Sequence, residues 1–284
     1  MPTISTLSKI EGTRAQGANI HFSGSTSSER EAVVQQVQKD TGAILVPPYD
    51  HPDIMLGQGT LALEFEDQVA ELADAKSASH EHLHLQTNGN ANGDRKSKGK
   101  LDAVLTPCGG GGMLSGTAIA LHGTGTRVFG AEPSFQGADD ARRGVAAGQR
   151  VTSVKTLTIA DGLRTPLGEH TWRVISNPEF VQGLYAVTEE NIKDAMKLVL
   201  ERMKLVVEPS AVVGLAAVLY NEELRGRVQR EAGVEGWDVG VVFSGGNTTV
   251  EAVAKLFAVR EEEGERAGGV VGRGGERVAE NVAG

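Results

Sequence analysis

Four consecutive glycines at positions 109–112 separate two short apolar segments. Residues 102–107 have the apolar run of a buried strand, and residues 113–121 have the small apolar side chains of a buried helix. Glycine loses more backbone entropy on folding than alanine, so four in a row are costly in a turn that only connects two elements. The backbone N–H groups of such a loop can converge on an anion at the helix N-terminus. A close crossing of the helix over the sheet is the alternative explanation.

The rest of the chain alternates between strand-like and helix-like segments. The predicted strands are residues 17–22, 43–46, 127–131 and 239–243. Predicted helices follow a capping box at residues 28–31 and begin near Gly57, at Thr188 and at Pro209. In the second of these helices, the apolar residues recur every three or four positions: Leu61, Phe65, Val69 and Leu72. This alternation predicts an α/β fold with three layers and a mostly parallel sheet.

Composition along the chain predicts its domain organisation. We expect residues 1–52 to be part of a small α/β domain and residues 53–260 to form a large α/β domain. Residues 76–100 are polar, which predicts a solvated insertion in the large domain. The insertion contains His80, His82 and His84, but no carboxylate or cysteine framework that would make them a metal site. Residues 261–284 have almost no apolar spacing and are predicted to be disordered.

The composition also excludes several classes of function. The 37 Asp and Glu residues exceed the 28 Lys and Arg residues, which argues against a nucleic-acid surface. No apolar run approaches the roughly 20 residues of a membrane span, and residues 1–9 lack the apolar core of a signal peptide. We therefore expect a cytoplasmic protein. Cys108 is the one cysteine, so an intrachain disulfide is excluded. No His or Asp is spaced to be its partner in catalysis, which favours a buried structural residue.

The glycine loop matches neither common nucleotide-binding pattern. It fits neither G-x-G-x-x-G nor G-x-x-x-x-G-K-[ST], which disfavours a dinucleotide or a P-loop nucleotide. Together with six other segments, however, it resembles serine racemase and the threonine/serine dehydratases, pyridoxal-phosphate enzymes of the tryptophan synthase β-like fold (fold type II). The segments occur in the order of that family: residues 52–60 (PDIMLGQGT), 107–116 (PCGGGGMLSG), 131–133 (AEP), 160–162 (ADG), 201–204 (ERMK), 208–211 (EPSA) and 244–247 (SGGN).

The resemblance implies a set of cofactor ligands. The cofactor phosphate would be held by Gly109, Gly110, Gly111, Gly112 and the Met113 amide. Ser244 would pair with the pyridine nitrogen, where a hydroxyl suits elimination and racemisation better than transamination. An ordinary turn serine is the alternative for Ser244.

The resemblance also implies two further sites. Glu132, the Ala138 carbonyl and Asp140 match the oxygen ligands of a divalent cation, Mg²⁺, Ca²⁺ or Mn²⁺. A solvated acidic loop is the alternative there. Lys204 and Asn247 match positions that contact an ATP effector in the racemase, while a solvated lysine at a helix end is the alternative.

Two motifs of this family are not in the sequence. One is S-F-K-x-R-G, whose lysine forms the Schiff base with the cofactor, and the other is S-G-N-H, which holds the substrate carboxylate. Met1-Pro2 matches a Met-Pro inside the family's small domain, so we expect the chain to be truncated at its N-terminus. No residue is then assigned a catalytic role, and we expect no conventional turnover from the chain alone.

The resemblance implies β-elimination of water from L-serine or L-threonine to a 2-oxo acid and ammonia, or racemisation at the α-carbon. Serine, threonine and 3-hydroxyaspartate remain open as substrates, and a homodimer is expected. The alternative is a catalytically inactive module that binds pyridoxal phosphate and regulates a complete paralogue. A relative of cysteine synthase or threonine synthase is disfavoured by Glu132-Pro133 together with residues 244–247.

Overall fold

The computed structural model describes residues 1–25, 27–83 and 99–258. The chain divides into two compact units, Met1–Asn247 and Thr248–Gly284. In the described part of the second unit, residues 250–258 form a helix. All other elements described below belong to the first unit. None of the described helices is long and apolar enough to cross a membrane.

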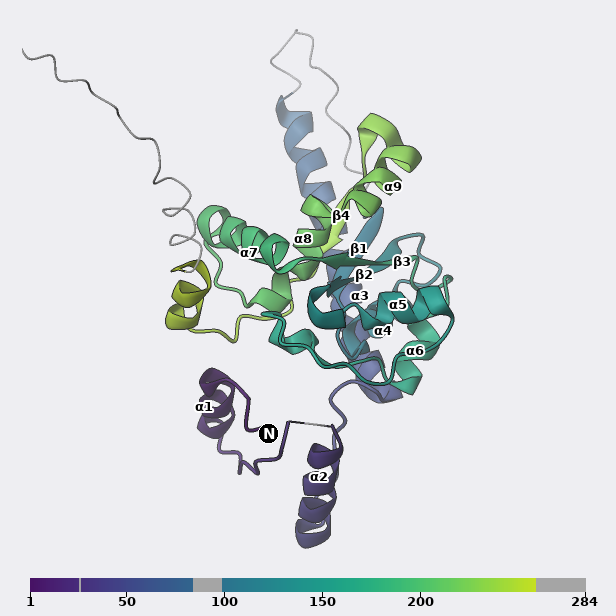
Figure 1. Ribbon diagram of the computed structural model, residues 1–284. Helices are drawn as coiled ribbons and strands as arrows, with labels where there is room; N and C mark the ends of the chain where they lie inside the picture. Colours follow the sequence, from purple (N-terminus) through teal and green to yellow (C-terminus); the bar gives the residue numbers. More distant parts are fainter. Residues whose placement is uncertain (26, 84–98, 259–284) are drawn as a thin grey trace, which may run out of the picture. The chain divides into compact units, whose positions relative to one another are not determined.

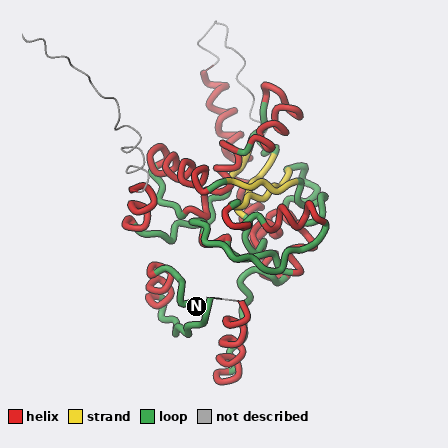
Figure 2. The backbone as a smooth tube through the Cα atoms, in the orientation of Figure 1, coloured by secondary structure: helices red, strands yellow, loops and turns green. Residues whose placement is uncertain are grey.

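A parallel sheet of four strands lies at the centre of the first unit (Figures 1 and 2). The strands β1 (Ala103–Pro107), β2 (Arg127–Pro133), β3 (Gly183–Val187) and β4 (Val239–Val241) have the spatial order β3-β2-β1-β4. The strands predicted at 102–107, 127–131 and 239–243 are confirmed. Strand β3 was not predicted. Because all four strands run in one direction, their carboxyl ends and the loops that follow them meet at one edge.

Helices cover both faces of this sheet, as the three-layer prediction requires. Val104 of β1 and Leu114 of α4 (Gly112–Ala120) belong to the same cluster of buried core residues. Leu105, the next residue of β1, lies beside Gly214 of α8 (Val213–Tyr220). Successive side chains of a strand point to opposite faces, so α4 and α8 pack on opposite sides. The other helices of this part are α5 (Asp140–Ala147), α6 (Glu169–Ile175), α7 (Glu189–Leu198) and α9 (Glu222–Ala232).

The long helix α3 (Pro52–Leu83) packs closely on α4. A Cβ atom on Gly59 would lie 2.8 Å from the Gly116 carbonyl oxygen, so both helices need glycine at this crossing. The predicted helix is confirmed, but its predicted inner face is partly wrong. Leu72 is 63% exposed, whereas the buried positions are Met55, Ala62 and Ala73. The crossing selects small residues, which a search for large apolar residues does not find.

Helix α3 continues to Leu83, so the first eight residues of the predicted insertion are helical. The side chains of His80, His82 and His84, the rest of the insertion up to residue 98, and the predicted disordered tail lie outside the described residues.

Residues 1–51 contain two helices, α1 (Leu7–Ala15) and α2 (Ser27–Thr41). The strands predicted at 17–22 and 43–46 are wrong, because both segments lack strand pairing. An isolated bridge joins Pro2 to Ser23, outside both segments. Ile44 is 91% and Val46 72% exposed. A strand needs a neighbouring strand to pair its backbone groups, and the described chain places none beside these apolar runs.

Candidate functional site

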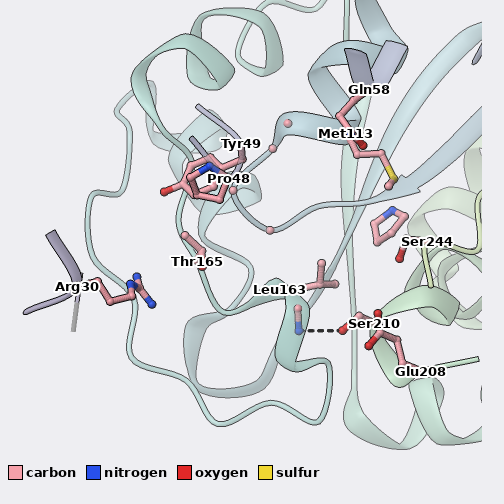
Figure 3. A pocket seen from close by; sticks show the side chains of 16 residues that line it. Arg30, Pro48, Tyr49, Gln58, Met113, Leu163, Thr165, Glu208, Ser210 and Ser244 are labelled. Atoms are coloured by element: carbon pink, nitrogen blue, oxygen red, sulfur yellow. Dashed lines mark hydrogen bonds between the residues drawn. The ribbon is translucent and has the colours of Figure 1, made fainter. Parts of the chain in front are cut away.

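The glycine run forms one wall of a cavity of about 540 Å³ at the carboxyl end of β1 (Figure 3). The first-turn amides of α4 have no acceptor within their own helix and are available to a ligand at this wall. The lining residues come from seven segments of the chain: Arg30, Pro48, Tyr49, Gln58, Pro107, Gly109, Gly110, Gly111, Gly112, Met113, Gly162, Leu163, Thr165, Glu208, Ser210 and Ser244.

Each glycine of the run is also packed against a neighbour. A Cβ on Gly109 would lie 2.9 Å from the Leu163 backbone, and one on Gly110 would lie 2.5 Å from the Tyr49 ring. Gly111 has a φ of +88°, a backbone conformation that residues with a side chain rarely adopt, and its Cβ position faces Leu167. Close packing therefore requires glycine at these positions, as an anion cradle also does. The presence of the four glycines does not by itself distinguish the two explanations.

The segment before α3 closes the cradle from one side. Tyr49 contacts Gly110 and Gly112, and burial raises the pKa of its hydroxyl, so the ring carries no charge at neutral pH. The neighbouring Asp50 carboxylate accepts hydrogen bonds from the backbone N–H groups of Glu169, His170 and Thr171, at 2.9, 2.9 and 3.1 Å. Asp50 thus caps α6 from a distant part of the sequence and fixes Tyr49 over the glycines.

A turn at Asp161–Leu163 forms the opposite wall. Ser210, which is buried, accepts a hydrogen bond of 3.0 Å from the Gly162 N–H, shown as the dashed line in Figure 3. Lys9 forms an ion pair of 2.7 Å with Asp161 from outside the cavity. These contacts connect residues of the ADG and EPSA segments, which the sequence only showed to occur in order.

Ser244 and Glu208 lie at the end of the cavity away from Tyr49 (Figure 3). The Glu208 N–H donates to the Gly245 carbonyl oxygen at 3.1 Å, so the loop after β4 is joined to the EPSA segment. Burial raises the pKa of Glu208, partly offset by the charge of Lys9, and its Oε2 atom is buried without a hydrogen-bond partner. The structure therefore brings Ser244 into the same cavity as the glycines, at a separate wall.

The three predicted cation ligands are all buried near the end of β2. Glu132 accepts hydrogen bonds from the N–H groups of Ala141 and Arg142, at 3.0 and 2.8 Å, and so caps α5. Ala138 and Asp140 are 0% and 3% exposed. Burial raises the pKa of Asp140 to about 7 and, with the charge of Asp140, raises that of Glu132. No cluster of three or more His, Cys, Asp or Glu side chains suited to a metal occurs among the described residues.

Lys204 and Asn247 do not line the glycine cavity. Lys204 adopts the left-handed conformation at the end of the Val199–Met203 turn, and its Nζ donates to the Glu201 carbonyl oxygen at 2.6 Å. The side chains of both residues are exposed. Their role with an ATP effector stays a prediction.

Cys108 is fully buried next to the cradle, and burial raises the pKa of its thiol well above the usual value. A thiol with a raised pKa is a poor nucleophile, in agreement with the structural role expected from the sequence.

Several cavity residues were not assigned a role from the sequence, among them Arg30, Tyr49, Thr165 and Glu208. Glu208 lies in the EPSA segment, so that motif was the available signal. Tyr49 and Arg30 lie outside the seven matched segments. Only the three-dimensional contacts of the loop around Pro48 and of helix α2 reveal them.

Comparisons with known proteins agree with this arrangement. The model of the family described as "Pyridoxal-phosphate dependent enzyme" matches residues 1–245. Serine racemase of rice (Oryza sativa subsp. indica) is 35% identical over 241 residues, which are 84% of this chain and 60% of that protein. L-threo-3-hydroxyaspartate ammonia-lyase of Saccharomyces cerevisiae is 34% identical over 266 residues, covering 92% of this chain and 68% of the yeast protein.

Among solved structures, maize serine racemase superposes with a TM-score of 0.72 at 33% identity, covering 93% of this chain and 70% of the maize chain. The chain thus spans about 60% of the length of the rice relative. The helix–sheet–helix layers, the glycine loop after β1 and the matched motif order lead to one assignment. This chain belongs to the pyridoxal-phosphate dependent enzymes of fold type II, in the group of serine racemases and hydroxy-amino-acid ammonia-lyases.

Proposed function

We propose that the chain is the cofactor-binding part of a pyridoxal-phosphate enzyme that removes water from, or racemises, a small hydroxy-amino acid. The observation that carries this proposal is the cavity lined by Gly109, Gly110, Gly111 and Gly112 at the start of α4. The amides of a helix's first turn and the helix dipole both favour a phosphate there. Because the chain spans only part of its relatives, the activity of a whole enzyme is inferred from the family.

The residues present fit such a cofactor. The amides from Gly109 to Met113 would hold the phosphate, and the wall at Ser244 offers a hydroxyl to the pyridine nitrogen. When bound, pyridoxal phosphate supplies an electron sink for the electron pair left by the α-proton. Tyr49 covers the glycines and restricts access of water to the phosphate end. Ser210 holds the Gly162 amide, which keeps the opposite wall of the cavity in place.

The chain alone is proposed not to turn over substrate. Its sequence has no S-F-K-x-R-G segment and hence no family lysine to accept the α-proton. L-Serine, L-threonine and 3-hydroxyaspartate are the candidate substrates of the whole enzyme, since proteins named for the first and third of these are similar to this chain.

Incubation with pyridoxal phosphate tests both parts of this proposal. The full chain would be mixed with the cofactor and each of the three amino acids, and 2-oxo acid would be measured with and without prior borohydride reduction. We expect bound cofactor, no 2-oxo acid and no pyridoxyl-lysine in peptide mass spectra. Formation of 2-oxo acid would show that the chain is active without the missing motifs, and absence of bound cofactor would refute the binding site.

A second proposal concerns a divalent cation. The Oδ2 atom of Asp140 is buried without a hydrogen-bond partner. Asp140 lies close enough to Glu132 that its charge, together with burial, raises the pKa of the Glu132 carboxyl. Two buried carboxylates and a backbone carbonyl, that of Ala138, are the hard oxygen ligands that Mg²⁺ and Ca²⁺ prefer. Such a cation would stabilise the loop between β2 and α5.

Thermal unfolding in the presence of Mg²⁺, Ca²⁺ or EDTA tests the cation site. Cation binding to the folded state is expected to raise the melting temperature with increasing concentration. Asp140→Asn keeps the shape of the side chain and is expected to remove the response, while Asp67→Asn on the exposed face of α3 is expected to leave it. An unchanged melting temperature of the parent protein in millimolar cation would contradict the site.

A further inference from the structure

The sheet of the first unit has two outer strands, β3 and β4, and side chains occupy the free side of β3. The Ala186 carbonyl oxygen, in β3, accepts a hydrogen bond of 2.9 Å from the Asn221 Nδ2 atom. The Gln182 carbonyl oxygen, just before β3, accepts one of 2.7 Å from the Arg227 Nη1 atom. Side chains that bind the carbonyl groups of an edge in this way keep another strand from pairing there.

The free side of β4 has no strand beside it and no side-chain hydrogen bond among the residues that the structure describes. The Val242 N–H donates to the Leu105 carbonyl oxygen at 3.0 Å, so residue 242 faces β1. Because successive residues of a strand face opposite neighbours, the N–H and C=O groups of Val239 and Val241 face away from β1. Both valines are half-buried, whereas every residue of the central strand β1 is buried.

The same chain contains a strand-like segment without a neighbour, residues 43–46 (Ala-Ile-Leu-Val). Ile44 and Val46 are 91% and 72% exposed and Leu45 between them is 48% exposed, which is the alternation of a strand. The backbone of residues 44–46 receives no hydrogen bond from the described part of the chain. The chain thus has one strand edge without a partner and one extended apolar segment without a partner.

Residues 43–46 are held in a way that favours pairing. Two prolines end the segment, and Tyr49 and Asp50, just after it, are fixed by the glycine run and by α6. A segment that is already restrained loses less conformational entropy on binding. Neither residues 43–46 nor Val239–Val242 include a charged residue or a proline, the residue types that protect edge strands from pairing.

We propose that β4 is a docking edge for residues 43–46 of a second copy of this chain. Within one copy the two segments are not paired, so the contact forms between copies. In a dimer with twofold symmetry each copy places residues 43–46 on the β4 edge of the other, and the contact is made twice. Backbone hydrogen bonds join the strands, and Ile44 and Val46 are removed from water. This interface uses no residue that lines the glycine cavity.

Sedimentation velocity of the full chain over a dilution series tests the dimer. We expect a species of twice the mass of one chain that dissociates on dilution. Val46→Lys, at an exposed position, is expected to raise the dissociation constant at least about tenfold, because lysine at a strand edge opposes pairing. Leu72→Lys, 63% exposed on α3, is the matched control and should leave the constant within about twofold. A parent protein that stays monomeric across the series, or a dimer unaffected by Val46→Lys, would overturn the proposal.

Cross-linking identifies the two segments. Cys108 is the one native cysteine and is buried, so a bismaleimide reacts with cysteines that are introduced at the surface. Chains with Ile44→Cys are mixed with isotope-labelled chains with Val239→Cys. We expect cross-linked dimers that contain one chain of each kind. Dimers linked only between identical variants, or no cross-linked dimer, would refute this interface. The measurement needs no cofactor, so it decides this proposal whether or not the chain binds pyridoxal phosphate.

Discussion

At the scale of single residues, the glycine run has two requirements that coincide. Gly111 needs its positive φ, and its position is closed by Leu167 and Ile175, at 2.6 and 2.7 Å from an ideal Cβ. The sequence predicts that the structure requires positions without side chains here, because four consecutive glycines are otherwise costly. It does not predict which neighbours press on them, since Tyr49 and Leu167 lie far away along the chain.

Gly111→Ala separates packing from backbone strain when it is compared with Gly123→Ala. Gly123 has a φ of +79° but nothing within 4 Å of its Cβ position, so alanine there adds strain alone. The left-handed conformation costs about 1–2 kcal/mol in both variants. Overpacking adds about 1–3 kcal/mol at Gly111 only. Urea unfolding should show this difference, and equal losses of stability would refute the close packing of the cradle.

At the scale of elements, segments with local signals were predicted and segments that depend on distant partners were not. Strand β1 and helix α4 are marked by an apolar run and small residues, and the Thr188 cap of α7 is confirmed by its hydrogen bond from the Asn191 N–H. The segments 17–22 and 43–46 have strand-like sequences without a neighbouring strand among the described residues. Strand pairing is a property of two segments, so one apolar run does not establish it.

At the α3–α4 crossing, two glycine-to-alanine substitutions on one helix are expected to change stability in opposite directions. Gly59→Ala places a methyl group 2.8 Å from the Gly116 carbonyl oxygen and should destabilise the protein by about 1–3 kcal/mol. Gly57→Ala has nothing within 4 Å and is exposed on the same helix. It should stabilise the protein by up to about 1 kcal/mol, because alanine favours helix. Chemical unfolding of both variants checks the signs, and a neutral Gly59→Ala would contradict the crossing.

The cap of α6 by Asp50 connects two elements that are distant in sequence. Asp50→Ala leaves three N–H groups at the start of α6 without their carboxylate and should cost about 1–2 kcal/mol. It should also weaken cofactor binding, because Tyr49 is released from the cradle. Asp67→Ala, exposed on α3, is the control and should change stability by less than about 0.5 kcal/mol. If both variants unfold alike, Asp50 is not a cap in solution.

At the scale of the whole molecule, the sequence predicts the fold and the position of the glycine cradle. It does not predict the full set of residues that surround the site. The parallel sheet, its covering helices and the position of the cradle follow from alternating apolar segments and from the resemblance to a known family. The open edge of β4 was not foreseen, because the order of strands in the sheet depends on segments that are far apart in the sequence. Such an edge exists only once the chain has folded.

The central claim is that the amides of residues 109–113 hold a phosphate group. Isothermal titration of the full chain with pyridoxal phosphate and with pyridoxal, which differs only by that group, tests it directly. If the cradle holds the phosphate, pyridoxal phosphate should bind at least a hundredfold more tightly, about 2.7 kcal/mol, in line with several charge-assisted hydrogen bonds. Equal affinities for the two compounds, or no binding of either, would contradict the account.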